Sequence, residues 1–131
     1  MSARFSAYEK VMGSTLSGRE LEASVLIKAA RLLKSCREQW DGQGHFKRLD
    51  EALVFNQRIW TIFQDELVKE DNPLPGQLRA DILNLSLFID KRIVDIMREP
   101  IAEKLDIIID INLNLAAGLR GSPGEGPTRQ G

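Results

Sequence analysis

The stretch NQRIWTIFQDELVKEDNPLPGQLR, residues 56–79, decides the fold because it ends one helical pattern and begins another within a few residues. Its first half continues a helical pattern that covers residues 46–69. Pro73 disfavours helical geometry at Asn72, and Pro75 suits the first turn of a helix, where its missing N–H needs no partner. We therefore predict an αα-hairpin corner that sets two helices at a fixed angle without a flexible linker.

Helical periodicity extends along the chain before this corner, with apolar residues at three- and four-residue steps. A first helix is predicted over residues 17–40, where Ser17 and Glu20 fit a capping box, and the glycines of residues 41–44 end it. Its apolar stripe consists of Leu21, Val25, Ala29, Leu32, Leu33, Cys36 and Trp40. The stripe of the helix over residues 46–69 consists of Leu49, Ala52, Leu53, Asn56, Ile59, Trp60, Phe63 and Leu67. Trp60 and Phe63 are interpreted as core residues.

A third helix, predicted over residues 76–98, carries two apolar stripes. The first consists of Leu78, Ile82, Leu85, Ile89, Ile93 and Ile96. The second lies nearly opposite at about 100° per residue, and it consists of Ala80, Leu83, Leu87 and Val94. One stripe can face the core, whereas the second needs another layer or a partner.

The segment over residues 101–119 follows Pro100, which interrupts the helix before it, and it fits two patterns. Ile109, Ile111, Leu113 and Leu115 alternate with polar residues as in a strand. A helical spacing is also present, formed by Ile101, Leu105, Ile108, Asn112, Leu115 and Leu119. We predict a helix, because the chain offers no second strand to pair with it. The apolar arc of that helix spans roughly 240°, whereas a surface helix needs little more than about 100°, so the helix is either central or a docking surface.

The two ends of the chain differ from this helical region. Residues 1–16 form a mixed arm whose apolar members are Phe5, Tyr8, Val11 and Met12. Gly118 is predicted to end the last helix, and the Gly/Pro-rich residues 120–131 predict a disordered tail. A length of 131 residues suits one domain. We predict an all-α fold, a compact bundle of about four helices over residues 17–119 between the arm and the tail.

Composition and charge restrict the possible binding partners and the cellular compartment. The net charge of −1 favours neither nucleic acid nor an anionic membrane. The first residues have no apolar core of a signal peptide, and the longest aliphatic run, residues 107–109, is far short of a membrane span. A single cysteine excludes an internal disulfide and a multi-cysteine metal site. A cytoplasmic location with no membrane contact is therefore expected.

The sequence contains no recognisable catalytic motif. The one histidine, His45, is interpreted as a solvated turn residue, and Cys36 as a buried structural thiol. The carboxylates fit exposed helix faces better than an acid/base pair, and no phosphate-binding glycine motif occurs. We expect a protein that is not an enzyme and needs no cofactor or metal.

Two further features leave alternatives open. Six basic residues in the first third, Lys28, Arg31, Lys34, Arg37, Lys47 and Arg48, form either a solvated face or an RNA-binding patch. The solvated face is favoured, because the first four surround the helix and no aromatic platform interleaves with them. Asn56 and Asn112 stand in apolar stripes and are interpreted as hydrogen-bonded core amides, with capture of a partner's backbone as the alternative.

Several short motifs follow one another in a specific order. They are Ala7-Tyr8; Gly18-Arg19-Glu20-Leu21-Glu22-Ala23; Ala29-Ala30-Arg31-Leu32; Asn56-x-x-Ile59-Trp60-Thr61-x-Phe63; Asp65-x-Leu67; Asn72-Pro73-Leu74-Pro75-x-x-Leu78-Arg79-Ala80; Asn84-Leu85; and Phe88-Ile89. This ordered set covers residues 7–89 and resembles the FlaF family, flagellar biosynthesis regulators of alphaproteobacteria. From residue 91 onward the resemblance is limited to helical character.

The resemblance implies a role in producing flagellin and delivering it for filament assembly, often in opposition to FlbT, which restrains flagellin translation. A direct, chaperone-like contact with monomeric flagellin, whose helical ends are buried only in the filament, is the favoured mechanism. Action on flagellin mRNA, alone or with an FlbT-like protein, is the alternative, and an architectural homodimer is a third. Surplus apolar helix surface supplies the candidate partner-binding residues: Tyr8, Leu83, Leu87, Val94, Ile107, Ile111 and Leu115.

Overall fold

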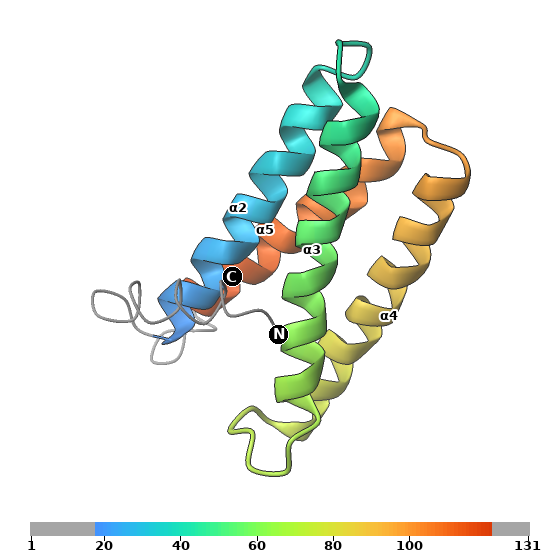
Figure 1. The fold of residues 1–131 in the computed structure, drawn as a ribbon. Helices are drawn as coiled ribbons and strands as arrows, with labels where there is room; N and C mark the ends of the chain where they lie inside the picture. The colour runs from blue at the N-terminus through green and yellow to red at the C-terminus, as the bar shows by residue number, and fades with distance from the viewer. Residues whose placement is uncertain (1–17, 122–131) are drawn as a thin grey trace.

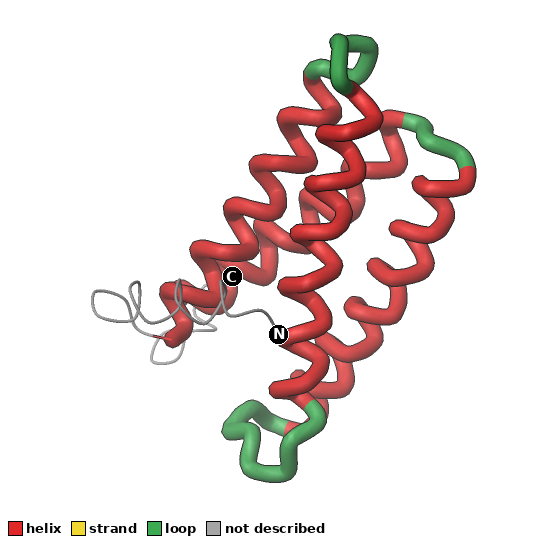
Figure 2. The backbone as a smooth tube through the Cα atoms, in the orientation of Figure 1, coloured by secondary structure: helices red, strands yellow, loops and turns green. Residues whose placement is uncertain are grey.

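A computed structural model describes residues 18–121 of the chain, which form four α-helices and one short 3-10 helix. The elements are α2 (Gly18–Glu38), α3 (His45–Leu67), α4 (Gly76–Arg98), η1 (Ala102–Leu105) and α5 (Asp106–Gly121). The helices run up and down along one long axis and are joined by turns at the two ends (Figures 1 and 2). This part of the chain contains no strand, so the all-α prediction is confirmed. The predicted arm, with Ser17 of the capping box, and residues 122–131 of the predicted tail lie outside it.

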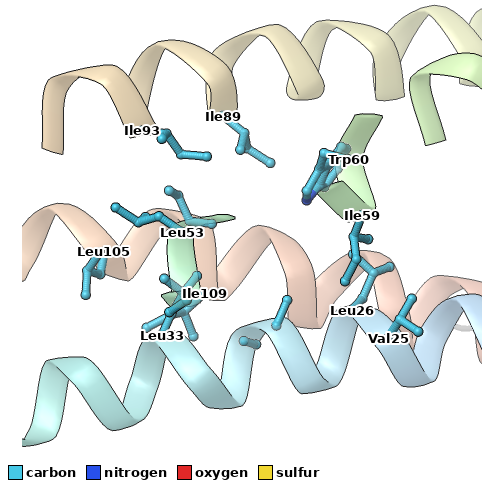
Figure 3. Packing of buried hydrophobic residues seen from close by; sticks show 14 of the residues in the cluster. Val25, Leu26, Leu33, Leu53, Ile59, Trp60, Ile89, Ile93, Leu105 and Ile109 are labelled. Carbon is cyan, nitrogen blue, oxygen red and sulfur yellow. The ribbon is translucent and has the colours of Figure 1, made fainter. Parts of the chain in front are cut away.

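One apolar core lies between the helices. α2 packs mainly against α5 and also against α3, whereas α4 packs against α3 and η1. In Figure 3, Ile89 and Ile93 point from α4 toward Trp60 and Leu53 of α3. The largest apolar side chains that are almost fully buried are Leu26, Leu33, Trp60, Ile89, Ile96, Leu105 and Ile108. Trp60 is therefore a core residue as predicted, while Phe63 is half-buried against the core.

The segment after Pro100 is helical, as predicted, but it is longer than expected. It begins with the 3-10 turn η1 and continues as α5 to Gly121. The prediction that Gly118 ends the helix is wrong. A glycine inside a helix is only about 1 kcal/mol less favourable than alanine, and Leu119 packs against the core just beyond it.

The corner between α3 and α4 is held by polar contacts, which confirms the predicted αα-hairpin. The Asn72 side chain donates to the Glu66 carbonyl at 3.0 Å and accepts from the Leu74 N–H at 3.0 Å. Arg79 of α4 donates to the Lys69 carbonyl at 3.2 Å. The proline at 75 lies just before the first helical residue rather than inside the first turn.

Ion pairs fix the connection between α4 and α5. Lys104 of η1 reaches back to Asp95 of α4 at 3.2 Å and to Glu99 at 3.5 Å. Arg37 at the end of α2 pairs with Asp106 at the start of α5, with 2.9 Å between Nε and Oδ1. These contacts place the start of α5 between α2 and α4.

Three residues of the predicted core stripes are exposed instead. They are Leu32 of α2 and Leu78 and Leu85 of α4. Because α4 packs mainly against α3 and η1, a narrow arc of α4 is buried. That arc includes Ser86, which is completely buried although the stripe prediction omitted it. Helical periodicity alone therefore predicted a buried side of α4 that is wider than the buried side in the structure.

Candidate functional site

A chain of buried polar side chains crosses the core between α3 and α5. The indole N–H of Trp60 donates to Asn112 Oδ1 at 2.9 Å, and Asn112 Nδ2 donates to Asn56 Oδ1 at 2.6 Å. All three residues have no exposed surface. The interpretation of Asn112 as a hydrogen-bonded core amide is confirmed, and Asn56 accepts from it. Capture of a partner's backbone by either amide is wrong for this arrangement, because no partner can reach them.

A second polar cluster joins α3 to α4. The Gln64 side-chain amide donates to the Ser86 hydroxyl and to Asp90 at 3.3 Å. Because these contacts lie on one flank of α4, they show which side of that helix faces α3. The sequence analysis did not single out Gln64 or Ser86, although Ser86 stands at a core spacing between Ile82 and Ile89.

The two candidate chemical groups, His45 and Cys36, both pack against neighbouring side chains. His45 is not a solvated turn residue: its ring packs 4.2 Å from the Trp40 ring and 4.7 Å from the Phe46 ring, measured between centroids. Cys36 is buried as predicted, and burial raises the pKa of its thiol. Among residues 18–121, no group of three or more His, Cys, Asp or Glu side chains is placed to hold a metal. None of the helices formed by these residues is both long enough and apolar enough to cross a membrane.

The basic residues of α2 do not form one patch. Lys28 lies over the Phe55 ring, 5.1 Å from its centroid. The hydrogen bond to Asp106 raises the pKa of Arg37, which is thereby paired with α5. Arg31 and Lys34 are exposed. Of the basic residues predicted on α2, Arg31 and Lys34 are exposed to solvent, whereas the charge of Arg37 is paired with Asp106.

Three of the predicted partner-binding residues form one row on α5. Ile107 is 37% exposed, and Ile111 and Leu115 are half-buried. They are four residues apart, so they share one side of the helix. Asp106 on another side faces α2 through its pair with Arg37, whereas Leu115 borders a groove together with Ile82 of α4. The row therefore lies away from the side of α5 that pairs with Arg37 of α2.

A matching row lies on α4. The pair between Asp95 and Lys104 shows which flank of α4 faces η1. Phe88, seven residues earlier, lies on the same flank, with Leu85 beside it, and both are exposed. The guanidinium of Arg92 lies over the Phe88 ring at 5.6 Å. We call these five partly or largely exposed apolar residues, Leu85 and Phe88 on α4 and Ile107, Ile111 and Leu115 on α5, the α4–α5 face.

The other predicted residues lie elsewhere. Leu87 and Val94 are 57% and 55% exposed. Val94 lies on the opposite side of α4 from Leu85, because the two positions differ by about two and a half helical turns. Leu83 is half-buried and packs against the core, so little of it is available to a partner. Tyr8 lies outside the described residues. The predicted residues therefore lie on more than one side of the bundle. The exposure of Leu85 and Phe88 was not predicted, because exposure within an apolar helix depends on its neighbours.

The fold is a small helical bundle in which α4 and α5 each carry a row of partly or largely exposed apolar residues. A family model described as flagellar protein FlaF matches residues 4–119, and the chain belongs to this family. The match extends well beyond the motifs of residues 7–89 and takes in α5. No match was found among curated proteins or among solved structures.

Proposed function

We propose that the protein binds monomeric flagellin in the cytoplasm as a chaperone-like partner and thereby supports flagellin synthesis and secretion. Membership of the FlaF family gives the flagellar context. The observation that carries the binding proposal is the α4–α5 face, of which Leu85 and Phe88 on α4 and Ile107 on α5 are exposed. Exposed apolar residues on two helices are suited to a partner helix that packs its own apolar side against them.

The energetics favour an apolar partner. Removing apolar surface from water contributes roughly 25 cal/mol per Å², and a stable interface covers about 800 Å² on each partner. The α4–α5 face offers five apolar side chains, of which Phe88 is the largest and carries Arg92 over its ring. A flagellin monomer presents helical ends that are buried only in the filament, so covering them would prevent premature polymerisation.

Regulation through flagellin mRNA, alone or with an FlbT-like protein, is the second candidate. Its support is the exposed basic pair Arg31 and Lys34 on α2. The pairing of Arg37 with Asp106 weakens this candidate, because it removes one charge from the patch. A contact of this kind would rest on charge and would weaken steeply as salt rises.

Calorimetric titration with purified monomeric flagellin at low and moderate salt tests the proposal. Apolar docking predicts micromolar or tighter affinity, little salt dependence and a negative heat-capacity change on binding. Binding of the flagellin transcript that weakens steeply with salt, without binding of flagellin itself, would replace the chaperone proposal with the mRNA proposal.

A further inference from the structure

An open pocket lies at the end of the bundle where the turn after α2 and the connection after α4 are found (Figure 1). Its volume is about 440 Å³, within the roughly 300–1,000 Å³ typical of ligand pockets. The side chains that line it are Trp40, Asp41, His45 and Phe46 from the turn and Pro100 from the connection. The pocket therefore combines aromatic rings with one carboxylate, and it shares no residue with the α4–α5 face.

Hydrogen bonds hold the turn that carries these rings. The Gly42 N–H donates to the Gln39 carbonyl at 2.9 Å, and the His45 N–H donates to the Gly42 carbonyl at 3.2 Å. The guanidinium of Arg48 donates to the same Gln39 carbonyl at 3.2 Å. The Trp40 and His45 rings meet edge to face, with 4.2 Å between their centroids. The aromatic wall of the pocket is therefore in place without a ligand.

Phe46 gives this wall an unusually exposed edge. The residue is 70% exposed, more than any other large apolar residue among residues 18–121. Covering such a ring removes apolar surface from water and favours binding. The face of an aromatic ring also attracts a cation, because the ring has a negative face and a positive edge. The pocket is therefore suited to a ligand that is both flat and positively charged.

The charges around the pocket favour the same kind of ligand. Asp41 is exposed, and within residues 18–121 its carboxylate has no ion pair. The arginines nearest to it in the sequence are already engaged: Arg37 pairs with Asp106 at 2.9 Å, and Arg48 donates to the Gln39 carbonyl. Coulomb attraction to Asp41 therefore favours a cationic ligand over an anionic one.

We propose that this pocket binds an arginine side chain of a partner polypeptide. The guanidinium group is planar and weakly hydrated, so it stacks on aromatic rings, and its N–H groups donate in a fixed fork to a carboxylate. Trp40 and Phe46 supply the rings, and Asp41 supplies the acceptor. A lysine ammonium is compact and strongly hydrated and fits this arrangement less well. The inference does not rest on flagellin binding.

An NMR titration of the full chain with the peptide acetyl-Gly-Arg-Gly-amide tests the inference. The matched control peptide carries citrulline, which is neutral and has nearly the same shape as arginine. The chain has two tryptophans, so the indole N–H signal of Trp40 reports on the pocket and that of the fully buried Trp60 is the internal reference. We expect the arginine peptide to shift only the Trp40 signal, with a Kd on the order of 1 mM, and the citrulline peptide to bind at least about fivefold more weakly.

Two pairs of variants locate the site. Phe46→Ala removes the exposed ring and Asp41→Asn removes the charge, and each should weaken binding of the arginine peptide at least about threefold. Val68→Ala and Asp71→Asn are the matched controls at the opposite end of the bundle and should leave the Kd unchanged. All four positions are exposed, so the variants are expected to fold.

Three results would overturn the inference. The first is an unchanged Trp40 signal at a peptide concentration about tenfold above the expected Kd. The second is equal binding of the arginine and citrulline peptides, which would exclude recognition of the charge. The third is an unchanged Kd in both Phe46→Ala and Asp41→Asn, which would place the peptide elsewhere on the protein.

Discussion

The indole N–H of Trp60 on α3 donates to the side-chain oxygen of Asn112 on α5 at 2.9 Å, although the two residues are 52 positions apart in the sequence. Asn112 also donates to Asn56, one helical turn before Trp60. Both contacts lie where no solvent reaches. Because both buried hydrogen bonds join α3 to α5, the arrangement fixes the register of α5 against α3.

Asn112→Ala should reduce the free energy of unfolding by about 3 kcal/mol, because it leaves the Trp60 N–H unpaired and opens a small cavity. Chemical denaturation monitored by circular dichroism measures the change. Asn114→Ala, at an exposed position on the same helix, is the matched control and should change stability by less than about 0.5 kcal/mol. Equal stability of the two variants would contradict a structural role for the Trp60–Asn112 contact.

Two glycines should respond oppositely to alanine. Gly44 has a φ of 77°, and a Cβ added there would lie 3.2 Å from Arg48, so Gly44→Ala should destabilise the protein by about 1–2 kcal/mol. Gly118 lies inside α5 with no atom within 4 Å of an added Cβ, so Gly118→Ala should stabilise it by about 0.5–1 kcal/mol. Thermal denaturation of both variants measures this, and a Gly118→Ala protein less stable than wild type would show that α5 ends before that residue.

Cys36 should be protected in the native protein. Burial raises the pKa of this thiol above its ordinary value of 9.0, with Glu51 adding to the rise and Arg48 opposing it. The associated stability is fully present below the unfolded pKa and is lost as pH rises through the folded pKa, because the unfolded chain ionises first.

Alkylation by iodoacetamide at pH 8 measures this protection. We expect the native rate to be on the order of 100-fold below the rate in denaturant, since reaction requires local opening. The denatured protein serves as its own control. Similar rates in the two conditions would place Cys36 at the surface.

Local signals account for the parts of the fold that the sequence predicted. Proline and glycine mark the helix ends near Pro73 and Gly44, and the three- and four-residue spacing of apolar residues identifies each helix. The choice between helix and strand after Pro100 also followed from the sequence, because a strand needs a neighbour that the chain lacks.

Which apolar side chains are exposed depended on tertiary packing and was predicted only in part. Leu85 and Ile89 belong to the same apolar stripe, yet only Ile89 is buried, because α4 leans on α3 with one flank. Similarly, His45 at the start of α3 is covered by Trp40 from the turn that follows α2, a contact that helical periodicity does not predict. Periodicity identifies an apolar side chain, whereas the crossing of the helices decides whether it is exposed.

The measurement that tests the central claim most directly is a calorimetric titration of monomeric flagellin with a matched pair of variants. Ile107→Asp places a charge on the α4–α5 face, and Val94→Asp places one on the other flank of α4, where the side chain is more exposed. Flagellin binding through the α4–α5 face predicts a Kd at least about tenfold weaker for Ile107→Asp, equivalent to about 1.4 kcal/mol, and an unchanged Kd for Val94→Asp. Absence of binding by the wild-type protein, or equal affinity of the two folded variants, would contradict the account.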